Sequence, residues 1–308
     1  MLHTWSNIEY QIRKTVGDIL IVVAVLLIVR WLFTLLYRCI FHYPNIFKKL
    51  HDKHWQHDVV YLHQFKKSAA IPNLSPFCLK LESWLRANKI KFKVCESWFV
   101  RSREGLLPFI ELNGEQIADS QLILSYLQDH FNLHDDLTAE EKGIARAVDR
   151  MIEGSTFYCL LYSKAYENAA NLMSRDISGL PFPRFITKFL SVFGSILIHK
   201  RLDANGVSRH KREDIIAILR KDIQAIDNIL GDKTFLLGAH LTAPDFTAFG
   251  HLATAYYLPY DQPIKKLLND EFPRVKAYIQ RIRQTLFPHW NTDEMATNSA
   301  TNTLTTTA

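Results

Sequence analysis

The stretch Ser75-Pro76-Phe77-Cys78 is the strongest indication of the fold of this chain. It follows the strand-like run Val59-Val60-Tyr61-Leu62 and opens an amphipathic helix that we expect to run to about Asn88. A helix N-terminus presents unpaired N–H groups and the positive end of the helix dipole, so a thiolate, alkoxide or bound anion is stabilised there. Because Ser75 occupies the first position, Cys78 lacks the resolving partner of a C-x-x-C pair, and dithiol exchange is not expected.

Length and composition allow two modest domains. The 308 residues are 48% hydrophobic and 22% charged, which is an ordinary globular balance. The formal net charge is +6, but no basic, aromatic-interleaved motif accompanies it, so we expect no nucleic-acid partner. The wide spacing of the cysteines fits neither a disulfide framework nor a zinc site and indicates reduced thiols on a cytosolic face. These cysteines are Cys39, Cys78, Cys95 and Cys159.

Residues 19–37 form an apolar segment that only Arg30 and Thr34 interrupt. A helix of this length, rising ~1.5 Å per residue, nearly spans a hydrocarbon core of ~30 Å. Arg30 costs roughly 2.5 to 3.5 kcal/mol on insertion scales, and the uninterrupted apolar run before it offsets that cost. No small-x-small cleavage site follows the segment. We therefore predict a retained transmembrane anchor, with residues 1–40 as tail and anchor, rather than a cleaved signal peptide.

Basic residues on both sides orient this segment. The positive-inside rule places the more basic flank, and with it the large C-terminal part, in the cytosol. We therefore predict a single-pass membrane protein with its C-terminal domains in the cytosol. The basic residues are Arg13 and Lys14 before the segment and Arg38, Lys48, Lys49 and Lys53 after it.

The sequence predicts that residues 41–57 form a polar linker that is rich in histidine. Histidines three residues apart can gather on one side of a helix and bind a metal. No carboxylate or thiol completes a ligand set nearby, so a solvated juxtamembrane segment is favoured and we predict no metal site. The histidines are His42, His51, His54 and His57.

Between residues 58 and 132 we expect the order strand, helix, strand, strand, strand, helix. Phe92-Lys93-Val94-Cys95 alternates as a strand does, and Asn113-Gly114 favours a tight hairpin between the next two strands. A second amphipathic helix follows from Ser120 to Phe131. The result is a small α/β unit.

Helix signals dominate the chain between residues 138 and 288. Thr138-Ala139-Glu140-Glu141 has the form of a capping box, and an apolar helical period runs from Ile215 to Leu230 and stops at Gly231. Residues 291–308 are rich in Thr, Asn and Ala without apolar periodicity, which predicts a disordered tail.

Two shorter motifs accompany the α/β unit. Leu107-Pro108-Phe109 stands just before the third strand, where an X-Pro bond can take the cis form at a cost of about 0.5 to 1 kcal/mol. A cis bond there would turn backbone groups toward a ligand. Asp119-Ser120 begins the following helix, with Ser120 as a favoured N-cap and free amides able to hold a carboxylate.

A third motif lies in the helical part. In Leu241-Thr242-Ala243-Pro244-Asp245-Phe246 we expect Thr242 to cap a helix while Asp245 reaches back to the amide of Thr242. Such a reciprocal pair is worth on the order of 1 kcal/mol.

In this order and spacing, the features resemble the cytosolic glutathione transferase superfamily over about residues 58–288. The resemblance implies an α+β chain, with an α/β thioredoxin-like N-terminal domain at 58–132 and an all-α C-terminal domain at 138–288, preceded by one transmembrane helix. With the apolar N-terminal segment and the motif from Ser75 to Glu82, the chain looks like the failed axon connections family, which includes the nematode cadmium-responsive proteins. Metaxins are more distant relatives of similar design.

The resemblance also implies roles for particular residues. Ser75 lies where a glutathione transferase holds its activating Ser or Cys, and Cys78 is a less favoured catalytic candidate. Leu107 before Pro108 would offer backbone bonds to the cysteinyl part of glutathione, and Asp119-Ser120 would receive the γ-glutamyl group. A hydroxyl donor and a helix dipole can stabilise a thiolate at neutral pH, which makes it a nucleophile.

Two departures from the family pattern bear on this site. Asp119 is shorter than the Glu or Gln usual in many classes, and the loop from Gln64 to Leu74 is longer than enzymes of this fold need.

Each site residue also has a purely structural interpretation. Ser75 before Pro76 is a good N-cap with Pro at the first helical position, and Cys78 can be a small buried hydrophobe. Tyrosines four residues apart on one helix face can line an acceptor pocket or belong to the core or to an interface. These tyrosines are Tyr158, Tyr162 and Tyr166.

Two functions are consistent with the resemblance. The first is a membrane-anchored glutathione-transferase-like protein in stress, xenobiotic or cadmium response or in axon development, with glutathione as substrate and a small electrophile as acceptor. The second is a non-catalytic, metaxin-like interaction module with protein partners at a membrane, whose lipid contact is made by residues 19–37. Both functions are compatible with a homodimer. The scattered cysteines argue against a metallothionein-like protein that binds cadmium through clustered thiols.

Overall fold

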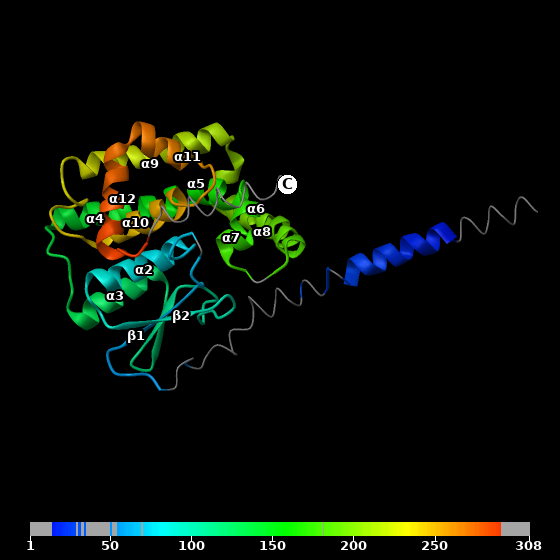
Figure 1. Cartoon of the computed structure of the whole chain (residues 1–308), viewed down its shortest axis with the longest axis horizontal. Helices are drawn as coiled ribbons and strands as arrows, with labels where there is room; N and C mark the ends of the chain where they lie inside the picture. The colour runs from blue at the N-terminus through cyan, green and yellow to red at the C-terminus, as the bar shows by residue number, and fades with distance from the viewer. Residues whose placement is uncertain are drawn as a thin grey trace, which may run out of the picture. The chain divides into compact units, whose positions relative to one another are not determined.

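A computed structural model gives the structure of the chain (Figure 1). It describes residues 14–28, 30, 31, 34, 50, 54–68, 70–180 and 182–290. These residues fall into two compact units. The first holds the described residues before 52 together with 103–105, and the second holds the rest.

The first unit contains helical backbone at residues 14–28, 30, 31 and 34. Within the described part of the chain, no helix combines the length and the apolar character needed to cross a bilayer. Residues 29, 32, 33 and 35–37 of the predicted anchor lie outside that part. The same is true of most of the predicted linker, of the flanking Arg13 and Arg38, and of the predicted tail.

The second unit begins with a four-stranded sheet in the order β2-β1-β3-β4. β1 and β2 pair in parallel, while β3 runs antiparallel to β1 and to β4. The strands are β1 (Val60–Gln64), β2 (Phe92–Glu96), β3 (Phe109–Leu112) and β4 (Glu115–Ala118). Helix α2 (Pro76–Ala87) connects the two parallel strands, and α3 (Ser120–Phe131) follows the last strand. The predicted order of elements is confirmed.

The hairpin between β3 and β4 turns where the Asn-Gly pair predicts it. Asn113 and Gly114 have φ values of 50° and 85°. Both residues therefore adopt the left-handed conformation that a two-residue hairpin of this twist requires, which Asn and Gly tolerate best.

One face of the sheet carries the core of this part. Val60 and Leu62 on β1 and Ile110 and Leu112 on β3 are fully buried, together with Trp84 of α2. Alternate residues of a strand point to the same face, so these four strand positions form one apolar surface against the helices. Each such side chain contributes about 1.5 to 3 kcal/mol on burial.

The remainder of the described chain is helical, as predicted. The Thr138 capping box forms with Glu141, and the helix that begins at Arg212 ends at Leu230, just before Gly231, where φ is 51°. The α-helices are α4 (Ala139–Met151), α5 (Phe157–Leu161), α6 (Ala169–Leu172), α7 (Arg175–Ser178), α8 (Arg184–Asn205), α9 (Arg212–Leu230), α10 (Ala243–Tyr256), α11 (Pro263–Lys266) and α12 (Pro273–Leu286). Two π-helical turns, Ile152–Thr156 and Tyr162–Tyr166, flank α5.

Helix α10 packs directly on α2 through Gly250. A Cβ atom at Gly250 would lie 2.5 Å from the carbonyl oxygen of Pro76 and 3.0 Å from the amide nitrogen of Lys80. Only a residue without a side chain allows the two backbones to come this close. This contact fixes the first turn of α2 against the helical domain.

Asp245 organises the start of α10, as its position in the sequence predicts. Its carboxylate accepts hydrogen bonds from the amide and hydroxyl of Thr242, the amide of Leu236 and the hydroxyl of Tyr278. The side chain is completely buried, so these four bonds replace its hydration. The role of Asp245 is structural.

Candidate functional site

The register of the sheet brings the predicted site residues to one end of it. His63 near the end of β1 pairs with Phe109 at the start of β3, and Phe109 in turn pairs with Ala118 at the end of β4. Pro108 and Asp119, each next to a member of this row, therefore lie at the end of the sheet where the chain leaves β1 toward Ser75.

Ser75 is the N-cap of α2. Its φ and ψ are −87° and 125°, Pro76 holds the first helical position, and its Oγ accepts a hydrogen bond from the amide of Cys78 at 3.4 Å. A hydroxyl that accepts a bond keeps its own hydrogen for a second partner. The cap and a hydrogen bond to a ligand thiolate are therefore compatible at Ser75.

Cys78 is buried in the first turn of α2. Burial raises the pKa of its thiol to about 12, and its side chain has no exposed surface. At pH 7 the protonated form then exceeds the thiolate by about 10⁵. The side chain behaves as the small buried hydrophobe of the structural interpretation.

The Leu107-Pro108 peptide bond is cis, as the motif before β3 suggested. Pro108 is buried and Leu107 is partly exposed.

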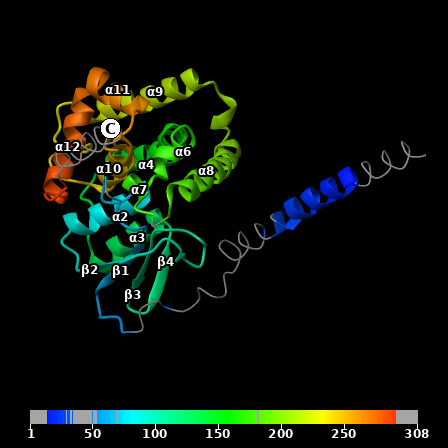
Figure 2. The same ribbon diagram turned by 45° about the vertical axis from the view of Figure 1, so that its right-hand side comes forward.

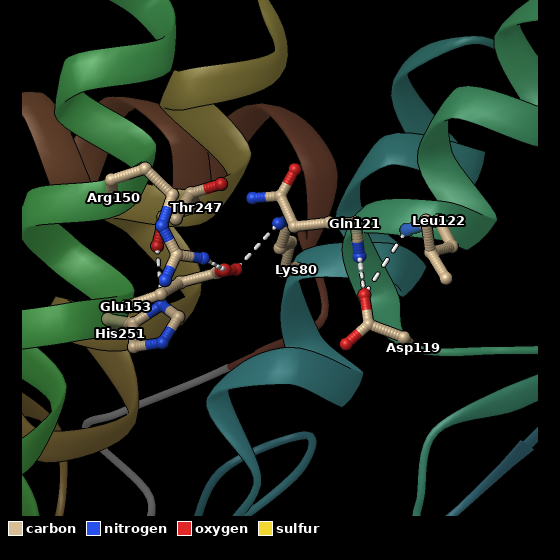
Figure 3. Close-up of polar contacts among 8 residues, drawn as sticks. All are labelled: Lys80, Asp119, Gln121, Leu122, Arg150, Glu153, Thr247 and His251. Carbon is tan, nitrogen blue, oxygen red and sulfur yellow. Dashed lines mark hydrogen bonds and ion pairs between the residues drawn. The ribbon is translucent and has the colours of Figure 1, made fainter. Parts of the chain in front are cut away.

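The start of α3 differs from the prediction, because Asp119 rather than Ser120 is the N-cap. Asp119 Oδ1 accepts hydrogen bonds from the amides of Gln121 and Leu122 at 2.9 and 3.2 Å (Figure 3). Asp119 has a φ of 70°, and Ser120 is the first, buried residue of the helix. The short side chain of Asp119 folds back onto its own helix, so two amides of the first turn of α3 are already bonded within the helix.

The long loop between β1 and α2 is held by buried polar groups. Asn73 is fully buried, donates to the carbonyl of Phe65 at 2.9 Å and accepts from the amide of Ser75 at 2.9 Å. The Ser68 hydroxyl donates to the carbonyl of Ile177, so the loop is also tied to the helical domain. An Asn side chain often bonds the backbone amide two residues on, and this tendency could have identified Asn73 from the sequence.

Lys164 is the second residue that sequence reasoning missed. Its ammonium group donates to the carbonyl of Leu74, directly before Ser75, at 2.6 Å. Burial lowers the pKa of Lys164 to about 7. No local pattern marks this residue, because residues 74 and 164 meet only in the folded chain.

A second buried lysine joins α2 to the helical domain. Lys80 is completely buried and its Nζ lies 2.8 Å from Glu153 Oε1, while Arg150 lies 3.7 Å from the other carboxylate oxygen (Figure 3). Nearby, burial and the charges of Lys80 and Lys164 lower the pKa of His251 to about 3. His251 is therefore a neutral imidazole, with Nδ1 2.8 Å from the carbonyl of Thr247.

The three tyrosines of the π-helical region pack against the core. Tyr162 and Tyr166 have ring centroids 5.4 Å apart, and Tyr158 contacts Phe157 at 5.0 Å. All three are partly buried on the hydrophobic core cluster. This packing supports the interpretation of the tyrosines as core residues.

Comparisons with protein families agree with this fold. Residues 76–171 match the model of the glutathione S-transferase N-terminal domain, and residues 219–282 match that of the C-terminal domain. The chain belongs to the glutathione transferase superfamily.

Two individual proteins are similar to this chain over most of its length. The chain is 32% identical over 262 residues to Failed axon connections of Drosophila melanogaster, across 80% of this chain and 62% of that protein's length. It is 25% identical over 230 residues to the isoprene-epoxide glutathione S-transferase of Rhodococcus sp. (strain AD45), across 70% of this chain and 93% of that protein.

A solved structure shows the same fold. The crystal structure of a glutathione transferase from Phanerochaete chrysosporium superposes with a TM-score of 0.54 at 13% identity. The match covers 75% of this chain and 99% of the fungal chain.

Proposed function

We propose that this chain binds glutathione at the N-terminus of α2, with the Ser75 hydroxyl stabilising the thiolate and a small electrophile as acceptor. The observation that carries the proposal is the gathering of Ser75, the cis Leu107-Pro108 bond and Asp119 at one end of the sheet. The relative named for isoprene epoxide supports an electrophilic acceptor. The remaining oxygen of Asp119, Oδ2, is the natural partner for the ammonium of a γ-glutamyl group.

Titration calorimetry with glutathione tests this proposal. We expect millimolar or tighter binding to the wild type, weaker binding to the Asp119→Ala, Ser120→Ala double variant, and retained binding with Ser75→Ala. Absence of binding at millimolar glutathione would overturn the proposal. Unchanged binding in the double variant would show that glutathione binds elsewhere on the chain.

Substitutions at Ser75 distinguish its role as a helix cap from stabilisation of the glutathione thiolate by its hydroxyl. Gly caps a helix nearly as well as Ser but has no side-chain hydrogen-bond donor, whereas Thr keeps the hydroxyl. We expect Ser75→Thr to lower the pKa of bound glutathione as the wild type does and Ser75→Gly not to do so. The ultraviolet absorbance of the thiolate measures this pKa. Equal values in both variants would make Ser75 a cap alone.

A second candidate is a non-catalytic interaction module that uses the transferase fold as a scaffold at a membrane. The observation in its favour is that Asp119 bonds the amides of its own helix. The calorimetric titration separates the two candidates, because only the first requires glutathione.

We further propose that residues 19–37 anchor the chain in a membrane, with the C-terminal domains in the cytosol. The uninterrupted apolar run before Arg30 and the more basic C-terminal flank support this topology. A tag after Ala308 should be protease-accessible in intact microsomes, and protection of the tag would reverse the orientation.

The similarity to Failed axon connections supports a role in axon development. A role in stress, xenobiotic or cadmium response rests on the sequence resemblance alone. The chain spans 62% of that relative's length, so this role stands as a proposal for the shared region.

A further inference from the structure

Helix α8 exposes an apolar stripe on one of its faces. Phe185, Phe189, Val192 and Ile196 are 74%, 71%, 62% and 50% exposed. Positions i, i+4, i+7 and i+11 lie on one face of a helix, so these side chains form a continuous strip about three turns long. The buried positions of α8, which include Thr187 and Ser191, lie on another face.

Positive charge accompanies this stripe. No acidic residue occurs between Asp176 and Asp203, while four exposed cations lie in that interval. At 100° per residue, Lys188 lies on one side of the stripe and Lys200 on the other. Asp203, two turns beyond Ile196, is 3.6 Å from His199. The four cations are Arg184, Lys188, Lys200 and Arg201.

The same corner of the molecule carries more basic residues. Lys66 and Lys67 are exposed on the loop after β1, and the Ser68 hydroxyl ties this loop to Ile177 of α7. Helix α8 lies at the outer edge of the helical domain in both ribbon views (Figure 2). The exposed fractions of its side chains leave the stripe open to a large flat partner.

The combination fits a lipid surface. An amphipathic helix with aromatic and aliphatic residues on one face and Lys or Arg beside them lies in the membrane interface, with its apolar side chains among the acyl chains. Helix α8 is not apolar enough to cross a bilayer. We propose that α8 binds in the plane of a bilayer that contains anionic phospholipids, through the stripe Phe185, Phe189, Val192 and Ile196.

This contact is separate from the proposed anchor at residues 19–37 and from glutathione binding. It would hold a second point of the chain at the lipid surface. Negative lipid headgroups attract each nearby Lys or Arg, and this attraction weakens as salt rises.

Depth-dependent quenching tests the contact in the full chain. In Phe189→Trp, the new indole should be quenched by brominated phospholipid in vesicles containing phosphatidylserine, beyond the quenching of the wild-type tryptophans. Leu122→Trp is the matched control, because Leu122 is 64% exposed but lies on α3. It should show no extra quenching. The extra quenching reports only on residue 189. It therefore distinguishes a lack of lipid contact at α8 from a lack of membrane insertion by residues 19–37.

Charge variants test the lipid specificity. Lys188→Glu combined with Lys200→Glu, placed in the Phe189→Trp chain, should abolish the extra quenching. Lys142→Glu combined with Lys221→Glu changes the net charge equally on exposed sites of α4 and α9 and should leave it unchanged. Equal loss in both pairs would overturn the proposal.

Three further outcomes would also overturn it. One is the absence of extra quenching in the Phe189→Trp chain, and another is equal quenching in vesicles of phosphatidylcholine alone. The third is blue-shifted emission of the introduced indole without vesicles. That shift would assign the stripe to a second copy if it depends on protein concentration and to another segment of this chain if it does not.

Discussion

At the scale of single residues, the candidate site depends on polar groups that are buried beside it. Lys164 holds the carbonyl of Leu74, and Asn73 holds the amide of Ser75. The position of Ser75 is therefore set by buried polar residues on both sides of its backbone. Burial of Lys164 has a measurable consequence for stability.

The pKa of Lys164 predicts how stability varies with pH. Burial lowers this pKa from 10.5 to about 7, so between pH 7 and 10.5 the unfolded chain binds more protons than the folded one. The contribution of Lys164 to the free energy of unfolding should therefore rise with pH in that window. The Lys164 contribution from pH 7 to pH 9.5 is about 3 kcal/mol.

Urea denaturation at several pH values measures this contribution. The wild type should gain about 3 kcal/mol relative to Lys164→Met between pH 7 and pH 9.5. Lys142→Met, at an exposed site of α4, should follow the wild type. Parallel curves for wild type and Lys164→Met would contradict the prediction.

At the scale of elements, the packing of α10 on α2 positions the start of α2. Helix α2 carries Ser75 at its N-cap, and the carbonyl of Pro76 and the amide of Lys80, one turn apart, lie against Gly250. A displacement of α10 therefore reaches the candidate site directly.

Gly250→Ala should destabilise the protein. The added methyl group would stand 2.5 Å from the backbone oxygen of Pro76, so one helix must move, at a cost of about 1 to 3 kcal/mol or more. Gly143→Ala in α4 is the control. Its Cβ meets nothing within 4 Å, so it should stabilise by about 0.5 to 1 kcal/mol. Thermal denaturation measures the change in stability of both variants. An unchanged midpoint in Gly250→Ala would refute the tight contact.

At the scale of the whole molecule, the sheet and the helical domain form one compact unit. Polar bonds from Lys164 to Leu74 and from Ser68 to Ile177 join them around the loop before Ser75, and the ion pair of Lys80 with Glu153 joins them again. The site is complete only when both parts are folded.

This joining predicts a single unfolding transition. Far-ultraviolet circular dichroism, dominated by the helices, and tryptophan fluorescence, which includes Trp84 in α2, should change together in urea. The midpoints should coincide in the wild type and separate in Gly250→Val, whose larger side chain pushes α10 from α2. Separate midpoints in the wild type would show two independent domains.

Local sequence is sufficient to predict the order of elements in the second unit. Strand alternation, the Asn113-Gly114 turn and the caps at Ser75, Thr138 and Thr242 are local signals, because each depends on residues a few positions apart. The same local signals located Ser75, the cis Leu107-Pro108 bond and Asp119. At Asp119-Ser120, however, local reasoning chose the wrong cap.

Tertiary packing determines which groups surround the site and which faces are left open. Lys164 meets Leu74 and Lys80 meets Glu153 across 90 and 73 positions of sequence, which no local period encodes. The exposed face of α8 depends on the same long-range packing, because an apolar stripe becomes core or surface only through the elements that pack against it. Contacts between distant segments thus surround the Ser75 helix cap with the other residues of the candidate glutathione site. The same packing leaves the apolar stripe of α8 on the surface.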